Sequence, residues 1–131
     1  MASTDSFELT SDAEKVTELY VRAFNSGDAA AVNSLYTEEA VAVWEPGSTL
    51  TGQARREHVV EFLARGATMR AKNRQTFVTS DTALLIVDWS IDTTDPDGSQ
   101  VHLTGTGVDV LRLGEDGKWR YAIDDPYGEA N

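Results

Sequence analysis

The sequence contains no cysteine among its 131 residues. Disulfide bonds, thiolate nucleophiles and cysteine metal ligands are therefore excluded together. Histidine is scarce as well: His58 and His102 are the only two, and no group of His, Asp and Glu has the spacing of metal ligands. We accordingly expect a protein without a metal site and without a cofactor.

Long apolar runs and basic residues are also lacking. The apolar runs are too short to cross a membrane, and residues 1–9 have neither the basic start nor the apolar stretch of a signal peptide. Only 11 Lys and Arg stand against 22 Asp and Glu, which gives a net charge of -11. A chain this acidic repels phosphate backbones. The sequence therefore predicts a cytoplasmic protein that binds neither nucleic acid nor a membrane.

The few basic residues are concentrated in one stretch. Six of the eleven lie between positions 55 and 74. We interpret this stretch as a solvated face that balances the acidic excess, with an anion-binding site as the alternative.

The chain has enough hydrophobic residues to form one hydrophobic core. Hydrophobic residues make up 40% of the chain, including three Trp, four Tyr and four Phe. A chain of this length supports one such core rather than two. We expect a single domain over residues 1–131, in which residues 1–9 are frayed.

The first half of the chain carries helical patterns. Ser11 and Glu14 fit a capping box, which predicts that a helix starts there. Asp28 suits the cap of a short second helix that reaches Tyr36, and residues 53–65 predict a third. The first of these helices presents a single apolar stripe, made of Val16, Leu19, Tyr20, Ala23 and Phe24.

Alternating patterns replace the helical ones after residue 66. They predict four strands, at residues 70–79, 82–93, 100–113 and 118–125. A shorter strand at 41–44 precedes the third helix and is ended by Pro46, which cannot donate to a ladder. The order predicts an α+β layer fold, with three helices followed by an antiparallel meander. Such a sheet has a second, partly apolar face, and we expect a homodimer to cover it.

The last two predicted strands form the hairpin that carries the acidic candidates. Residues 114–117 (GEDG) supply the turn, because Asp-Gly tolerates the positive φ values of tight hairpin loops. Once the turn sets the register, Asp109, Asp124 and Asp125 acquire definite faces. Regular alternation of the apolar residues at 119–123 places Asp125 on the apolar side.

Three stretches of the chain resemble a known superfamily: residues 20–28 (YVRAFNSGD), residues 35–52 (LYTEEAVAVWEPGSTLTG) and residues 107–128. In these stretches the chain resembles the nuclear transport factor 2-like (NTF2-like) superfamily, which includes ketosteroid isomerases and polyketide cyclases such as SnoaL. Within that superfamily the chain resembles in particular the small stand-alone proteins of the DUF4440 type, some of which belong to bacterial natural-product gene clusters. The resemblance implies a cone-shaped fold in which three N-terminal helices pack on a curved, mostly antiparallel sheet and enclose a cavity.

The resemblance to ketosteroid isomerase also implies catalytic residues. Tyr20 matches the Tyr of the first helix and Asp109 matches the protonated Asp of the sheet, which together form an oxyanion hole. At the position of the proton-shuttling Asp this chain has Trp44, and Glu45 matches only after a slip of one residue. One residue on a strand separates an inward from an outward side chain. An inward Glu45 would favour proton transfer beside a carbonyl, whereas an inward Trp44 would favour binding without that base.

Two functions remain open at this point. The first is a cofactor-free enzyme that isomerises, cyclises or hydrates an apolar carbonyl compound through Tyr20, Asp109 and Glu45. The alternative is a ligand-binding or dimeric interaction module that performs no chemistry. In both cases we expect the small molecule to contact a common set of side chains, namely Trp44, Phe24, Phe62, Trp89 and Asp125.

Overall fold

The computed structural model describes residues 8–45 and 47–128. In chain order these residues form η2 (Ala13–Lys15), α1 (Val16–Asn25), α2 (Ala29–Ser34), β1 (Tyr36–Glu45), β2 (Ser48–Leu50), α3 (Gly52–Leu63), β3 (Thr68–Val78), β4 (Thr82–Thr94), β5 (Gln100–Leu113) and β6 (Trp119–Asp125). The expected fraying concerns mainly residues 1–7, which lie outside the described residues. Leu9 is partly buried against the core.

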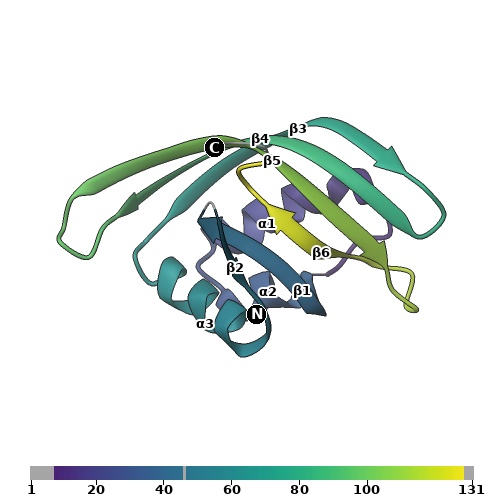
Figure 1. Cartoon of the computed structure of the whole chain (residues 1–131), viewed down its shortest axis with the longest axis horizontal. Coiled ribbons are helices and arrows are strands. Elements are labelled where there is room, and N and C mark those ends of the chain that lie inside the picture. The colour runs from purple at the N-terminus through teal and green to yellow at the C-terminus, as the bar shows by residue number, and fades with distance from the viewer. Residues whose placement is uncertain (1–7, 46, 129–131) are drawn as a thin grey trace.

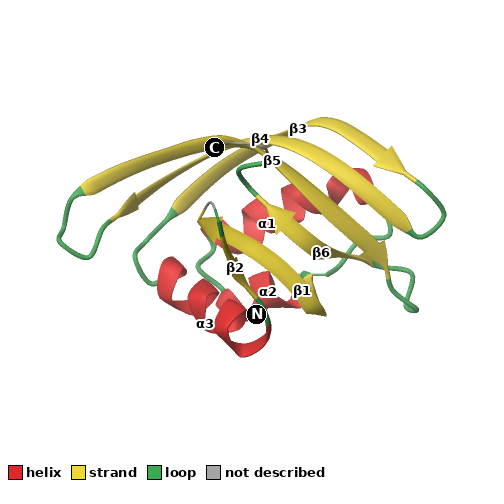
Figure 2. Ribbon diagram, in the orientation of Figure 1, coloured by secondary structure: helices red, strands yellow, loops and turns green. Residues whose placement is uncertain are grey.

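The six strands form one sheet in the order β2-β1-β6-β5-β4-β3. The antiparallel meander from β3 to β6 is confirmed, and β1 joins its end by pairing in parallel with β6. Figure 1 and Figure 2 show the long strands arching over the helices. The core lies between the helices and this inner face of the sheet, and its most deeply buried apolar residues include Val16, Phe24, Val32, Leu35, Leu85 and Leu111.

The helix starts follow the predicted chemistry with one correction. Asp12, not Ser11, caps the first helical turn, because its Oδ1 accepts a hydrogen bond of 3.0 Å from the backbone N–H of Glu14. Asp28 caps α2 as predicted, accepting from the backbone N–H of Ala31 at 3.0 Å. None of the helices in the described ranges is long and apolar enough to span a membrane.

The predicted strand at 41–44 is longer than expected. It begins at Tyr36, which was predicted to end the second helix, and it runs to Glu45. Pairing with β6 explains the difference, since Tyr36 is the register partner of Tyr121. Tertiary pairing thus overrides the local helical pattern at this position.

A β-bulge interrupts the predicted alternation in β6. Leu111 pairs with Tyr121, whereas the preceding Val110 pairs with Ile123. Ala122 is therefore the extra residue of β6, and it has no direct partner in β5.

The bulge at Ala122 decides which acid faces the helices. Beyond it, Asp124 is the partner of Asp109 on the inner face, and Asp125 is the partner of Val108 on the outer face. The prediction that Asp125 points inward is wrong, because it assumed a strand without a bulge.

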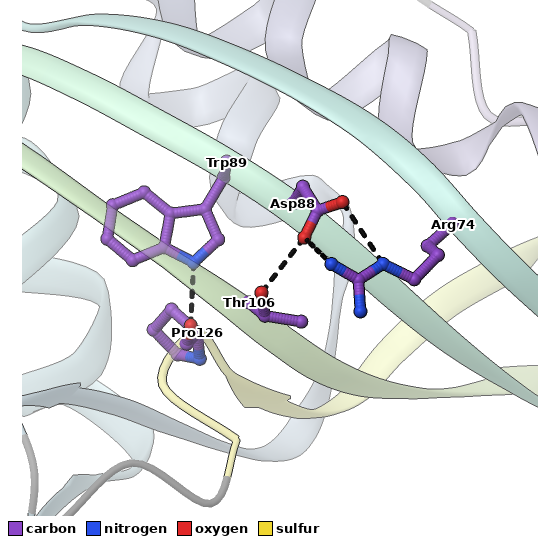
Figure 3. A network of polar contacts seen from close by, with 5 residues as sticks. All are labelled: Arg74, Asp88, Trp89, Thr106 and Pro126. Atoms are coloured by element: carbon purple, nitrogen blue, oxygen red, sulfur yellow. Dashed lines mark hydrogen bonds and ion pairs between the residues drawn. The ribbon is translucent and has the colours of Figure 1, made fainter.

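Two glycines of β5 allow the C-terminal turn to approach the inner face of the sheet. A Cβ on Gly105 would lie 2.9 Å from the Trp89 ring and 3.1 Å from the carbonyl oxygen of Pro126. A Cβ on Gly107 would lie 3.0 Å from the Pro126 Cα. Because glycine has no side chain, Trp89 and Pro126 can approach each other over these two positions. The Trp89 indole N–H donates a hydrogen bond of 2.6 Å to the Pro126 carbonyl (Figure 3).

The outer face of the sheet carries exposed polar groups beside this region. Asp88 accepts hydrogen bonds from the Arg74 guanidinium, the shorter at 2.8 Å, and from the Thr106 hydroxyl at 2.9 Å (Figure 3). The pair is partly exposed, so it contributes little to stability.

The close approach at Gly105 leads to a prediction about stability. We expect Gly105→Ala to lower the free energy of unfolding by about 1–3 kcal/mol, because the added methyl forces the Trp89 ring or the C-terminal turn to move. Urea denaturation measures the change. Thr104→Ala, at the exposed neighbouring position, is the control and should alter stability by less than about 0.5 kcal/mol. Equal stability of the two variants would contradict the prediction.

Candidate active site

A cavity of about 340 Å³ lies between α1, α3 and the inner face of the sheet. This volume is within the range of pockets that hold small molecules. Apolar side chains supply most of its wall, among them Trp44, Phe62, Met69, Val87, Trp89 and Leu103. Polar side chains gather where β5 and β6 meet α1, at the end of the cavity that we call the polar end, made of Thr17, Tyr20, Asp109, Tyr121 and Asp124.

Most of the residues predicted for the site line this cavity. They are Tyr20, Asp109, Trp44, Glu45, Phe62 and Trp89. Phe24 does not line it: its side chain is buried behind the wall, with ring centroids 6.1 Å from Tyr20 and 6.0 Å from Phe62. It lies one helical turn beyond Tyr20 and packs toward α3, so the prediction for Phe24 is wrong. Asp125 does not line the cavity either, because the bulge at Ala122 places it on the outer face of the sheet.

A chain of hydrogen bonds crosses the polar end. The Tyr36 hydroxyl donates to Oδ2 of Asp124 at 2.6 Å, and the hydroxyl oxygens of Tyr20 and Tyr36 are 2.8 Å apart. Because Tyr36 uses its proton for Asp124, Tyr20 donates to Tyr36. Tyr20 therefore has the structural partner that a buried tyrosine requires, and it also faces the cavity.

Sequence reasoning gave Tyr36 no role in the site, because it placed this residue at the end of a helix. The signal that could have identified it is Thr37, a β-branched residue that directly follows and favours a strand. Regular alternation placed Asp125 rather than Asp124 on the apolar side, and only the bulge brings Asp124 to the same face as Asp109.

Asp109 and Asp124 form a buried pair of carboxyl groups. Burial raises the pKa of Asp109 well above its ordinary value, and the charge of the neighbouring Asp124 raises it further. Burial also raises the pKa of Asp124, but the side chains of Asp109 and Tyr36 lower it in part. Two carboxylates this close cannot both ionise out of water. The pKa of Asp109 is raised further than that of Asp124, so Asp109 keeps the proton of the pair and Asp124 ionises first.

Arg55 is the buried cation next to this pair. Its side chain is 1% exposed, and its guanidinium carbon lies 4.4 Å from the centre of the Tyr36 ring. The charge of Arg55 lowers the pKa of Asp124 and so favours the ionised form. The prediction that residues 55–74 form a solvated basic face is thus wrong for Arg55.

Trp44, rather than Glu45, occupies the interior at the position of the expected base. The pairing of β1 with β2 shifts register between Val43 and Glu45, so Trp44 has no partner in β2. Its ring packs against His58 and Phe62, with centroid distances of 4.6 and 5.2 Å. Glu45 is exposed and contributes only to the rim of the cavity.

His58 is a cavity residue to which sequence reasoning gave no role. Partial burial lowers the pKa of His58, so its imidazole is neutral at neutral pH and can accept a proton. Within the described residues, no three His, Asp or Glu side chains gather as a metal site requires.

The raised pKa of Asp109 predicts how stability depends on pH. The folded protein holds a proton on Asp109 that the unfolded chain releases above about pH 4. Stability from this group is therefore present below that pH and is lost as the pH rises toward the pKa of the folded state. We expect the free energy of unfolding to fall less between about pH 5 and about pH 8 in Asp109→Asn than in the unsubstituted protein, as measured by urea denaturation.

Asp97→Asn is the control for this measurement. The backbone N–H of Ser99 lowers the pKa of Asp97, so this exposed turn residue is charged in both states across the same interval. The control should keep the original pH dependence. An Asp109→Asn variant that also keeps it would contradict the protonated assignment.

Comparisons with known proteins concern the fold and the family of the chain. No sequence among the curated proteins matches the chain. Among solved structures, a conserved protein from Planctomyces limnophilus is similar with a TM-score of 0.75 at 19% identity, over 84% of this chain and 88% of that one. A candidate scytalone dehydratase from Novosphingobium aromaticivorans has a TM-score of 0.74 at 16% identity, over 90% and 91% of the two chains.

A third solved structure is a ketosteroid isomerase-like protein from Erwinia carotovora, with a TM-score of 0.68 at 19% identity over 85% of this chain and 88% of that one. At these identities the likeness concerns the fold alone. The family model of the SnoaL-like domain matches residues 16–122, which is most of the chain. The protein therefore belongs to the SnoaL-like family of the NTF2-like superfamily.

Proposed function

We propose that the cavity binds an apolar small molecule with a carbonyl group and moves a proton within it, as an isomerase, cyclase or hydratase does. One observation carries this proposal. Asp109 and Asp124, the first protonated and the second charged, lie together at the polar end of a cavity whose wall is mostly apolar. A neutral acid beside a carboxylate is the arrangement that proton transfer requires.

The roles follow from the protonation states. Asp109 directs a carboxyl group toward the bound carbonyl oxygen and stabilises the negative charge that develops there. Asp124 accepts the proton from the adjacent carbon, and return of that proton to another atom completes the reaction. Tyr36 and Arg55 are positioning residues, because they hold the charge on Asp124. His58 is the second proton acceptor on the cavity wall.

Binding without turnover is the alternative function. Its support is the inward position of Trp44, where the expected base would stand, together with the exposed position of Glu45. In that case the same cavity would hold a ligand unchanged. The cytoplasmic location and a role in bacterial natural-product metabolism stay predictions from the sequence.

Exchange of carbon-bound protons tests the proposed chemistry. We expect the protein to accelerate the incorporation of deuterium at the carbons beside the carbonyl of 2-tetralone in D₂O. The loss of the proton NMR signal of these carbons measures the rate. Asp109→Asn and Asp124→Asn should each lower the rate by roughly 10²- to 10⁴-fold, because each removes one proton-transfer group. His58→Gln tests the second acceptor in the same assay.

Asp125→Asn is the matched control, since it changes the adjacent acid on the outer face and should keep the original rate. Full activity in both cavity variants would rule out the assigned roles. Thermal stabilisation by 2-tetralone without any exchange would favour the binding function instead.

The homodimer belongs to the same proposal. An apolar row crosses the outer face through consecutive register partners on five strands, namely Phe77, Leu84, Val110, Ile123 and Val41. Phe77 is 55% exposed and Ile123 is 44% exposed. A continuous apolar row that is exposed at Phe77 and Ile123 and partly exposed between them supports association, and a second copy supplies a matching surface.

Changing the exposed end of this row tests the dimer. We expect Phe77→Glu to shift the protein from dimer to monomer in sedimentation velocity, because a charge would be buried at the interface. Val78→Glu is the control, since Val78 is also exposed, at 53%, but the neighbouring position on a strand points to the opposite face. A protein that is monomeric at micromolar concentration before substitution would contradict the proposal.

A further inference from the structure

Unpartnered polar atoms concentrate around the cavity. Within residues 8–45 and 47–128, four buried side-chain nitrogen or oxygen atoms lack a hydrogen-bond partner: Trp44 Nε1, Arg55 Nε, Thr93 Oγ1 and Asp109 Oδ1. Three of these four side chains line the cavity, namely those of Trp44, Thr93 and Asp109. Buried polar groups in native proteins are nearly always paired, and an unpaired one calls for an explanation. A ligand in the cavity would supply the missing partners.

The unpartnered atoms are spread along the cavity rather than clustered. Asp109 belongs to the polar end, where its partner in β6 is Asp124. Asp124 is also the partner of Ala42 in β1, and Trp44 follows two residues later. Two residues of strand correspond to about 6–7 Å, so the Trp44 side chain is displaced along the cavity from the carboxyl pair.

Much of the remaining cavity wall is apolar. Phe62 packs against the Trp44 ring at 5.2 Å, and Val87 and Trp89 cover the opposite side from β4. The other cavity indole, that of Trp89, already donates its N–H to the Pro126 carbonyl. Trp44 is therefore the cavity indole whose N–H has no hydrogen-bond partner among residues 8–45 and 47–128.

We propose that the ligand carries two oxygen groups at opposite ends of an apolar ring system, and that the second oxygen accepts a hydrogen bond from the Trp44 indole N–H. The indole nitrogen only donates, so the group opposite it must be an acceptor, such as a carbonyl, an ether or a hydroxyl oxygen. This inference rests on the proposed function, in which the first oxygen is the carbonyl at Asp109. It assigns to Trp44 the recognition of the far end of the same molecule.

Two probes that differ in one oxygen test the inference. 2-Tetralone has a single carbonyl, whereas 6-methoxy-2-tetralone adds an ether oxygen across the ring system. We expect calorimetry to give a dissociation constant roughly 3- to 10-fold lower for the methoxy compound, the gain typical of one added hydrogen bond. Trp44→Phe keeps the aromatic wall but removes the N–H, and it should abolish this preference.

Trp119→Phe is the matched control. The Trp119 indole N–H donates to the Ser11 carbonyl at 3.1 Å, and Trp119 is not among the residues of the cavity wall. This variant should keep the preference for the methoxy compound. Equal binding of the two probes, a preference that survives Trp44→Phe, or binding of neither probe would overturn the inference.

The same probes separate this inference from the proposed function. If the methoxy preference depends on Trp44 but no deuterium exchange occurs, the recognition role stands and the proposed chemistry fails. If Trp44→Phe keeps a preference while exchange depends on Asp109 and Asp124, the chemistry stands and the recognition role fails.

Discussion

Asp109 and Asp124 are register partners on neighbouring strands at the polar end of the cavity, where Asp109 is buried and Asp124 is partly buried. Two buried carboxylates at this separation repel each other, so one proton must stay on the pair. The rest of the polar end is arranged around that requirement. Tyr36 donates to Asp124 and not to Asp109, and this asymmetry assigns the charge to Asp124. Asp109 is left with an oxygen that has no hydrogen-bond partner in the part of the chain that the structure describes. The chemistry proposed for the cavity depends on this difference in hydrogen bonding between two side chains of the same type.

Helix α3 supports the polar end and the apolar wall at once. Arg55 points from it toward the ring of Tyr36, while His58 and Phe62, at helical spacings of three and seven residues, reach the cavity. Transferring the Arg55 guanidinium from water to the protein interior costs free energy. The nearby charge of Asp124 and the ring face of Tyr36 offset that cost. The helix therefore couples the charge balance of the carboxyl pair to the shape of the wall.

Much of this fold was predictable from the sequence, and the exceptions share a cause. The meander and the cap at Asp28 follow from alternation and turn chemistry, which are local properties. Tyr20 and Asp109 were found through a resemblance to a known superfamily, and both side chains line the cavity. The errors concern Tyr36, which tertiary pairing draws into a strand, and Asp125, whose face depends on a bulge. Neither pairing partners nor bulges leave a reliable local pattern, so no reading of period alone could have placed these two side chains.

The bulge at Ala122 has a consequence for how the site tolerates change. Asp124 and Asp125 are the same residue type in succession, and they point to opposite faces. A β6 of the same length that paired without the bulge would have the opposite phase beyond Ala122, which would turn Asp125 inward and Asp124 outward. A carboxyl group would still lie on the inner face, close to Asp109, in that register. The repeated acid therefore keeps an acid on the inner face with or without the bulge, although the position of that acid along the sheet would change.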